Sequence, residues 1–464
     1  MASSGGVKYQ YLAGFCANII SVSYGAFCGW PSASFLELQA DNSPLESGPL
    51  SNSDAGWVSS TLCLGGVVGT IVFARLADKL GRKPALLLMA LPSLIGWLIL
   101  PYARNPIHLC VARFLGGSAG GGCFAVIPIY VVELAESRVR GILGTFVVLG
   151  CNLGVLAAFT MGYFFNYKQV AWMMSILPLL FIICFVFMPE TPQFLLQCNK
   201  LEEAEHALRY YRNIKKRVSK ELSEELKLEL RQLRTPEKGE EADANVNSAI
   251  TLADFLEPKA RKAFLIGIGL AATNQICGAF AMLNYTGVIF QQSGSTLPPT
   301  LAAIIVGTIQ ILGTYISTLL VERAGRKVLM LVSAAGIGIS QCAMGTYSYL
   351  TLLGYETGAF SWVPIVGFSV MMLVAAVGLL TVPIIVLSEI MPVKIRSMAY
   401  MIFMAFLWLL TGFMLKSLPI FSESLGMHGT VFLFAVGAFA SGLFIAIFVP
   451  ETKGKSIETI LDSM

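Results

Sequence analysis

Eleven long stretches of this chain contain no charged side chain. They cover residues 11–36, 55–74, 84–103, 114–132, 141–167, 169–189, 263–321, 328–355, 357–388, 397–415 and 429–450. About 20 apolar residues of helix cross a bilayer, and unpaired backbone groups in lipid favour helices over open strands. The stretch 263–321 is long enough for two crossings, and Ser-Gly-Ser-Thr-Leu-Pro-Pro at 293–299 predicts a turn between them. We therefore predict an all-α membrane protein with twelve transmembrane helices.

The longest polar segment, residues 190–260, separates the sixth and seventh predicted helices, and polar signals recur on both sides of it. The recurring signals are Arg82-Lys83 and Arg326-Lys327, Glu133 with Arg140 and Glu389 with Arg396, and Pro189-Glu190-Thr191 and Pro450-Glu451-Thr452. Such a six-helix repeat is typical of transporters that bind a solute between their halves and expose it alternately to each side. We predict a bundle at 1–189, a cytoplasmic linker with surface helices at 190–260, and a second bundle at 261–464.

The distribution of charge predicts an orientation. The chain has 464 residues, of which 55% are hydrophobic and only 13% charged, about half the charge of a soluble domain. If the N-terminus is cytoplasmic, 28 of the 32 Lys and Arg residues lie on cytoplasmic segments, as the positive-inside rule requires. We expect both termini in the cytoplasm. The net charge of +4 reflects this asymmetry and does not indicate nucleic-acid binding.

No catalytic or metal-binding pattern is present in the sequence. The three histidines are scattered, the ten cysteines lack paired spacing, and no phosphate-binding glycine loop occurs. We expect neither an enzyme nor a bound cofactor or metal. The expected partners are a small-molecule solute and the lipid bilayer, with the monomer as the functional unit. No retention or lipidation signal is evident, so we expect the plasma membrane.

The repeated motifs resemble those of the sugar porter family of the major facilitator superfamily, over residues 11–456. Arg75 to Lys83 resembles the motif after span two, and the segment from Arg113 through Glu133 to Arg140-Gly141 resembles that of span four. The two Pro-Glu-Thr segments resemble the motifs that close spans six and twelve. Among sugar porters the chain is most similar to the insect trehalose-transporter-like branch. The resemblance implies the major facilitator fold and facilitative transport of a monosaccharide or a trehalose-like disaccharide.

Charged residues at the predicted cytoplasmic helix ends are candidates for a gating network. They are Arg82, Lys83, Glu133, Arg140, Glu190, Arg326, Lys327, Glu389, Arg396 and Glu451. One reading is positive-inside anchoring, because exposed ion pairs contribute only about 0–1 kcal/mol. The other is a set of salt bridges that form when the cytoplasmic side is closed and break when it opens. The seven-residue spacing puts Glu133 and Arg140 near one face if the helix continues.

Carboxamides and an aromatic residue within the apolar spans are candidates for sugar binding. They are Asn274, Gln275, Asn284, Tyr285, Trp408, Asn152 and Gln310. A carboxamide both donates and accepts hydrogen bonds, which suits a ring of hydroxyl groups, and an indole can stack on the apolar face of a sugar. The alternative is that these residues only bond helix to helix. The resemblance favours Gln275 and Trp408, while Phe280 and Ile384 depart from the family's polar and aromatic residues.

The first span lacks the acidic residue that a proton relay would need. The resemblance places Phe27 where proton-coupled sugar porters have Asp, and the charge-free spans supply no carboxylate. We therefore expect uniport.

Arg113 lies within span four, where it either faces protein or a cavity or extends towards the outer surface. Two other functions stay open: a sugar sensor without transport, to which the short predicted tails give no support, and a porter for a polyol or another small solute.

Overall fold

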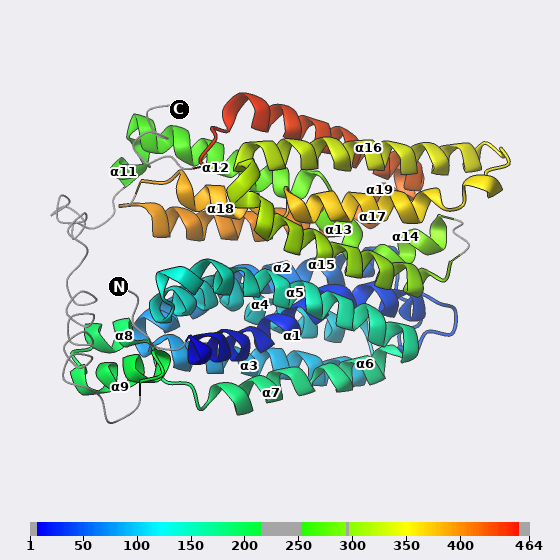
Figure 1. The fold of residues 1–464 in the computed structure, drawn as a ribbon. Coiled ribbons are helices and arrows are strands. Elements are labelled where there is room, and N and C mark those ends of the chain that lie inside the picture. Colours follow the sequence, from blue (N-terminus) through cyan, green and yellow to red (C-terminus); the bar gives the residue numbers. More distant parts are fainter. Residues whose placement is uncertain (1–6, 215–251, 294–296, 393, 454–464) are drawn as a thin grey trace.

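The computed structural model describes residues 7–214, 252–293, 297–392 and 394–453, and all regular structure in these ranges is helical (Figure 1). The first half contains α1 (Lys8–Leu38), α2 (Asn52–Leu80), α3 (Arg82–Ile99), η1 (Leu100–Tyr102), α4 (Pro106–Leu134), α5 (Ser137–Phe164), α6 (Tyr167–Met174) and α7 (Ile176–Phe185). Three short helices follow, namely α8 (Pro192–Gln197), α9 (Leu201–Tyr211) and α11 (Leu252–Leu256). The second half contains α12 (Pro258–Ile276), α13 (Ala279–Asn284), α14 (Thr286–Gln292), α15 (Pro299–Ala324), α16 (Arg326–Leu352), η2 (Gly358–Phe360), α17 (Val363–Val377), α18 (Val382–Glu389) and α19 (Arg396–Phe448).

Twelve membrane crossings follow from these helices. In the described residues, eleven helices or helix groups are long and apolar enough to span a bilayer. The last of them, α19, has 53 residues and contains Gly426 at φ 70° and ψ 170°, far from helical values. A straight helix of that length would measure about 80 Å, against a hydrocarbon core of about 30 Å. The chain therefore reverses at Gly426, and α19 supplies spans eleven and twelve. The prediction of twelve helices in two six-helix bundles is confirmed.

Three spans are broken helices. Span six divides at Ser175 between α6 and α7, and span ten divides between α17 and α18. Span seven divides at Cys277 and Gly278, where Gly278 has φ +71°, and again at Tyr285 between α13 and α14. A left-handed backbone is accessible to glycine at no steric cost. Broken backbone at membrane depth is tolerated only where it is buried in protein or lines a cavity.

The two bundles lie side by side, with the N-terminal helices in the lower part of Figure 1 and the C-terminal helices above them. The start of α1, helices α8, α9 and α11, and the end of α19 lie at one end, which we call the terminal face (left in Figure 1). The other end is the opposite face. Helix α9 packs beneath the first bundle because Ala204, Leu208 and Tyr211 form a buried apolar side. Helices α8 and α9 lie in the predicted linker 190–260, of which residues 215–251 lie outside the described ranges. The domain boundaries themselves stay a prediction.

Helices α2 and α4 approach so closely that only glycine fits at several positions. A Cβ on Gly117 would lie 1.8 Å from the carbonyl oxygen of Leu62, and one on Gly121 would lie 2.1 Å from that of Gly66. Small residues allow such backbone contact, which drives helix association where lipid supplies no hydrophobic force. The glycine-rich start of the span-four motif is therefore a packing surface for α2.

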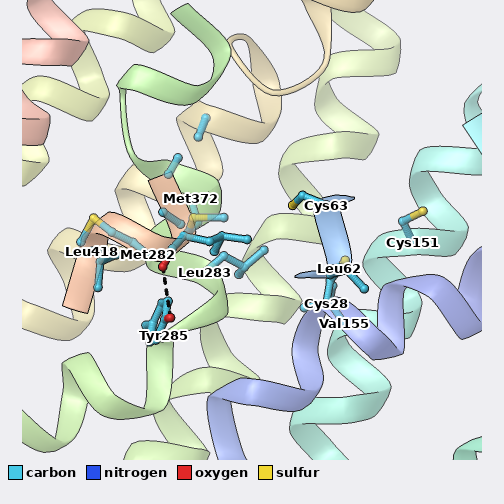
Figure 2. Close-up of a cluster of buried hydrophobic side chains, with 14 of the residues drawn as sticks. Cys28, Leu62, Cys63, Cys151, Val155, Met282, Leu283, Tyr285, Met372 and Leu418 are labelled. Atoms are coloured by element: carbon cyan, nitrogen blue, oxygen red, sulfur yellow. Dashed lines mark hydrogen bonds between the residues drawn. The ribbon is translucent and has the colours of Figure 1, made fainter. Parts of the chain in front are cut away.

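A continuous apolar core joins the halves. It contains Cys28, Leu62 and Cys63 from the first bundle together with Met282 and Leu418 from the second. Figure 2 shows these residues in two groups, one around α1 and α2 and one around the broken span seven. Apolar side chains of both bundles therefore belong to one core.

Candidate substrate pathway

At the opposite face, backbone and side-chain hydrogen bonds hold the two halves together. The Tyr285 hydroxyl donates to the carbonyl oxygens of Ala55 and Leu415, each at 3.2 Å. The Gly287 amide donates to Ser32 Oγ at 3.0 Å. The contacts with Ala55 and Ser32 join Tyr285 and α14 to α2 and α1, whereas the contact with Leu415 stays within the second half. Tyr285 is buried. In this conformation the pathway is closed at the opposite face, and Tyr285 is part of that closure.

Farther out on the same face, Lys416 of α19 lies over the start of α2. Its Nζ donates to the carbonyl oxygen of Ser53 at 2.9 Å and to Ser53 Oγ at 3.2 Å. The ammonium also lies 4.4 Å from the centre of the Trp57 ring, a cation–π contact. Asn52 Nδ2 donates to Glu423 Oε1 at 2.6 Å. Both contacts cross between the halves and reinforce the closure.

Midway along the bundles, a buried polar group links α5 to α15. Asn152 Nδ2 donates to Thr314 Oγ1 at 2.7 Å, and Gln310 Nε2 donates to Asn152 Oδ1 at 3.1 Å. Gln310 Oε1 is buried without a hydrogen-bond partner. Two of the predicted sugar-binding residues are thus in direct contact across the interface, and one of them has a free acceptor.

Trp408 reaches across from α19 into the first bundle. Its ring packs edge-to-face with Tyr24 at 5.9 Å and near Phe124 at 6.2 Å between ring centres. The indole packs directly on the backbone of α2 at Gly66, because a Cβ at this position would lie only 2.6 Å from the ring. The Trp408 Nε1 proton is buried and unpaired. The indole therefore has both an apolar face and an unused donor at the interface of the halves.

The four polar residues of span seven lie on both sides of its break. Asn274 Nδ2 donates to the carbonyl oxygen of Leu379 at 2.6 Å, and Gln275 Nε2 donates to Asn274 Oδ1 at 2.6 Å. Asn284 Nδ2 donates to the carbonyl oxygen of Phe280, within the same segment, and its Oδ1 is buried and unpaired. Asn274 is thus engaged with span ten, whereas Asn284 keeps a free acceptor.

At the terminal face of the first bundle, Glu133 joins three helix ends. Arg82 NH2 lies 2.8 Å from Glu133 Oε1, and Thr191 Oγ1 donates to Glu133 Oε2 at 2.6 Å. Glu190 accepts from the backbone amides of Lys83 and Thr191. The side chains of Arg82 and Glu133 are 9% and 6% exposed, so this is a buried ion pair.

The second bundle repeats this arrangement. Arg326 NH2 lies 3.1 Å from Glu389 Oε1, and Thr452 Oγ1 donates to Glu389 Oε2 at 2.6 Å. Glu451 accepts from the backbone amides of Arg326 and Lys327. The main difference is exposure, since the Glu389 side chain is 27% exposed. Each network lies within one half, and both exist while the opposite face is closed.

Arg140 and Arg396 occupy equivalent positions in the two halves, and both donate to backbone oxygens. Arg140 NH2 donates to the carbonyl oxygen of Ala135 at 3.4 Å, and Arg396 donates to that of Met391 at 3.4 Å. Glu133 and Arg140 were expected near one face if the helix continued, and this condition is not met. Helix α4 ends at Leu134 and α5 begins at Ser137, so the chain turns between the two residues.

The equivalent carboxylates Glu190 and Glu451 have opposite pKa shifts. Burial raises the pKa of Glu190, and the hydrogen bonds from Thr191 and Lys83 offset this only in part. Burial also acts to raise the pKa of Glu451, but amide hydrogen bonds from Lys453, Arg326 and Lys327 outweigh it and lower the pKa. The additional Lys453 amide, 3.0 Å away, distinguishes the second site.

Arg113 lies fully buried inside the first bundle. Its guanidinium donates to the backbone carbonyl of Phe27 and, at 3.2 Å from Nε, to that of Val58. The Phe27 ring stacks on Trp97 with 3.9 Å between centres. Of the two sequence-based alternatives for Arg113, the structure places its head in the protein interior. It bridges α1, α2 and α4 through backbone oxygens.

Comparisons with known proteins identify the family. A family model described as "Sugar (and other) transporter" matches residues 1–462. The facilitated trehalose transporter Tret1 of Bombyx mori is 31% identical over 97% of this chain and 86% of its own length. The trehalose transporter 1 of Drosophila melanogaster is 30% identical over 97% of this chain, which spans about half, 51%, of that protein.

The chain belongs to the sugar transporter family. Its fold is also that of solved family structures. The inward-open conformation of the xylose transporter XylE from E. coli superposes with a TM-score of 0.78, covers 98% of this chain and 99% of that one, and is 22% identical. The proton:xylose symporter XylE bound to 6-bromo-6-deoxy-D-glucose superposes with a TM-score of 0.75 at 22% identity, over 98% and 99% of the two chains. The protein is therefore a multi-pass membrane transporter with the major facilitator fold.

Several polar residues of this sugar transporter were missed by sequence reasoning. Gln341 donates to the carbonyl oxygen of Cys277, and Ser333 contacts the break in span ten. Lys416 and Thr314 join the halves. A signal existed for two of them, since Gln341 is the one carboxamide in the apolar stretch 328–355 and Lys416 the one charge between residues 397 and 422. Their partners are mostly backbone groups, which no sequence pattern specifies.

Proposed function

We propose that this protein carries a sugar down its concentration gradient by alternating access of a site between its two halves. The observation that carries the proposal is the buried Asn152–Gln310 contact, which crosses the interface midway and leaves Gln310 Oε1 unpaired. A buried acceptor without a partner is costly, and a sugar hydroxyl is a suitable donor for it. The interface of the repeats is also where such transporters bind their solutes.

The proposed sugar contacts are Gln275, Asn274, Asn284, Tyr285, Trp408, Asn152 and Gln310. Unpaired buried atoms on Asn284, Gln310 and Trp408 support this set, because they offer two acceptors and one donor. The Trp408 ring supplies an apolar surface for stacking. The trehalose transporters and the sugar-bound XylE structure found among the similar proteins favour a monosaccharide or a trehalose-like disaccharide as substrate.

We propose uniport as the mode of transport. The buried cation Arg113 is bonded to backbone oxygens rather than to a carboxylate, so no proton-accepting group is paired with it. Phe27, which stands where the family resemblance expects a proton-carrying Asp, is stacked on Trp97. A proton relay requires an ionisable group at membrane depth.

For the orientation, we propose that the terminal face is cytoplasmic and that the protein acts as a monomer in the plasma membrane. The basic residues concentrate on the segments at the terminal face, which supports a cytoplasmic location for it. The closed opposite face would then be the extracellular one. The ion-pair networks at the terminal face, with Arg140 and Arg396 nearby, are proposed to hold the helix ends of each half together as the halves move.

The test is uptake of radiolabelled glucose, xylose, trehalose and a polyol into proteoliposomes that contain the purified protein. We expect saturable uptake of at least one sugar, and a tenfold or greater loss of uptake in Gln310→Leu. Thr308→Val is the matched control, because Thr308 lies on the same helix, is exposed and bonds only its own helix backbone at Ile304. Uptake of the polyol alone, or binding of sugar without any uptake, would contradict the proposal.

A further inference from the structure

Two spans of the C-terminal half are broken, and side chains of α16 form hydrogen bonds with both of them. Span seven breaks at Cys277 and Gly278, and span ten breaks at Gly378, which has φ −127° and ψ −85°. A break removes helical hydrogen bonds, and in a membrane the released backbone groups must find partners within the protein. Side chains of α16 provide partners at both breaks.

Gln341 contacts the break in span seven. Its Nε2 donates to the carbonyl oxygen of Cys277 at 2.8 Å and lies 3.7 Å and 3.6 Å from the sulfurs of Met282 and Met371. Gln341 and Cys277 are both 0% exposed. Gln341 Oε1 is unpaired in this conformation. The amide is thus a buried polar group whose hydrogen bond to protein backbone is made at the break.

Ser333, two helical turns before Gln341 on α16, contacts the break in span ten. Its hydroxyl donates to the carbonyl oxygen of Val374 at 2.6 Å and accepts from the Leu379 amide at 3.0 Å. A Cβ on Gly378 would lie 2.4 Å from Ser333 Cβ and 2.5 Å from the carbonyl oxygen of Leu329. The backbone of span ten at Gly378 therefore packs directly on α16. The Ser333 hydroxyl hydrogen-bonds a backbone group on each side of the break, Val374 before it and Leu379 after it.

Asn274 connects the two breaks. It lies in the last turn of α12, and its Nδ2 donates to the carbonyl oxygen of Leu379, the same residue whose amide donates to Ser333. A displacement at one break is therefore transmitted to the other through Leu379. The first bundle differs, because its spans one and four are the unbroken helices α1 and α4, and Ser93 of α3 bonds a side chain, Ser23.

The segment beyond the span-seven break makes the closure at the opposite face. Tyr285 and Gly287, which follow the break, donate to groups on α2 and α1. A change of backbone angles at Cys277 and Gly278 would move these donors away from the first bundle. The break is therefore placed where a hinge for opening the opposite face is needed.

We infer that α16 stays in place while spans seven and ten bend at their breaks. Gln341 and Ser333 of α16 are positioning residues that set the backbone angle at these two breaks. The inference rests on the proposed alternating access. The Gln341 bond to Cys277 belongs to the conformation closed at the opposite face, so its loss shifts the population towards the conformation open there. Because Gln341 Oε1 is unpaired and the other contacts of Nε2 are with two sulfurs, the bond to the Cys277 carbonyl is the strongest hydrogen bond of the amide.

The experiment compares Gln341→Met with the wild type. Methionine keeps the length and apolar surroundings of the side chain but removes the donor. Each protein carries Val288→Cys, because Val288 lines the cavity beside Tyr285 at the opposite face. Maleimide labelling of residue 288 in detergent, followed by mass spectrometry of its peptide, reports opening of that face. We expect the labelling rate to rise about two- to tenfold, as loss of one net hydrogen bond implies, and the KM for sugar entering from that face to fall.

Thr346→Val is the matched control, because Thr346 also lies on α16 but bonds only the carbonyl oxygen of Cys342 in its own helix. It should leave labelling and KM unchanged. If Gln341→Met does not fold, as judged by its thermal midpoint, Ser333→Ala provides the same test at the second break. Unchanged labelling in a folded variant overturns the inference. A wild type that transports no sugar, with labelling still raised in the variant, overturns the proposed function but not the hinge.

Discussion

The guanidinium of Arg113 donates to the backbone carbonyl of Phe27, so a buried cation in the first bundle is held by main-chain oxygens. A carbonyl oxygen cannot take up a proton at physiological pH, whereas a carboxylate at that position could. Phe27 directs its side chain to Trp97 instead. The hydrogen-bond partner of this cation on α1 is therefore a backbone oxygen and not a carboxylate.

We predict that an imposed proton gradient will not drive accumulation of sugar by the wild-type protein. Sugar inside proteoliposomes should reach the external concentration and no more, with or without an inward pH gradient of about two units. The measurement is the plateau of uptake with a protonophore as control. Accumulation above the external concentration that the protonophore abolishes would refute uniport.

Arg113→Lys tests the structural role of the same residue. The guanidinium donates from two of its nitrogens to the carbonyl oxygens of Phe27 and Val58. An ammonium has a single nitrogen and cannot reproduce this planar arrangement of donors. One of these buried acceptors would be left unpaired, at a cost of about 1–3 kcal/mol. We expect a lower thermal midpoint in detergent. A midpoint equal to that of the wild type would show that the two carbonyl contacts contribute nothing.

Gly117→Ala should separate α2 from α4. The new Cβ would lie 1.8 Å from the Leu62 carbonyl oxygen, and overpacking of this kind costs about 1–3 kcal/mol or more. Gly141→Ala is the matched control, because a Cβ added to Gly141 in α5 would have no atom within 4 Å, and alanine favours helix. Thermal unfolding should show a loss for the first variant and none for the second.

Glu133→Gln should destabilise the protein more than Glu389→Gln. Neutralising Glu133 leaves the buried Arg82 without its carboxylate, and removing one partner of a buried ion pair is destabilising. The Glu133 carboxylate is itself buried, so relief of its desolvation offsets part of this loss. Glu389 is more exposed, so water compensates part of the loss at Arg326. The measurement is the loss in thermal midpoint of each variant relative to the wild type. Equal losses would indicate that burial does not set the strength of the two ion pairs.

Glu190→Gln and Glu451→Gln should differ in their dependence on pH. The lowered pKa of Glu451 means that its carboxylate stabilises the fold above its ordinary pKa of 4.5, and that this contribution is lost as the pH falls through the lowered pKa. Glu451→Gln should therefore be less stable than the wild type at pH 7, and the difference should shrink in acid.

The raised pKa of Glu190 acts in the opposite direction. Its protonated form is favoured in the fold, so its contribution is present below pH 4.5 and is lost as the pH rises through the raised pKa. Glu190→Gln should be at least as stable as the wild type at pH 7. Thermal midpoints from about pH 3 to pH 8 cover both effects, and parallel curves for the two variants would contradict the opposite shifts.

The number of spans, the halves and the repeated helix-end motifs followed from the sequence because each depends on local composition. A run of apolar residues must cross the bilayer as a helix whatever its neighbours are. The repeat predicted that Arg82 and Arg326 occupy equivalent places, and they do. The charged residues between the stretches 114–132 and 141–167 predicted a connection there, but not the residue at which α4 ends, Leu134.

The sequence by itself determined that the chain crosses the membrane twelve times in two related bundles, because hydrophobicity and charge act residue by residue. Only the tertiary structure decided which polar groups meet. Asn274, expected to face a sugar, donates to the Leu379 carbonyl, and Gln341 donates to that of Cys277. Their partners are backbone atoms released by helix breaks. The position of such an atom depends on how three or more helices pack together, and no single segment of the sequence encodes it.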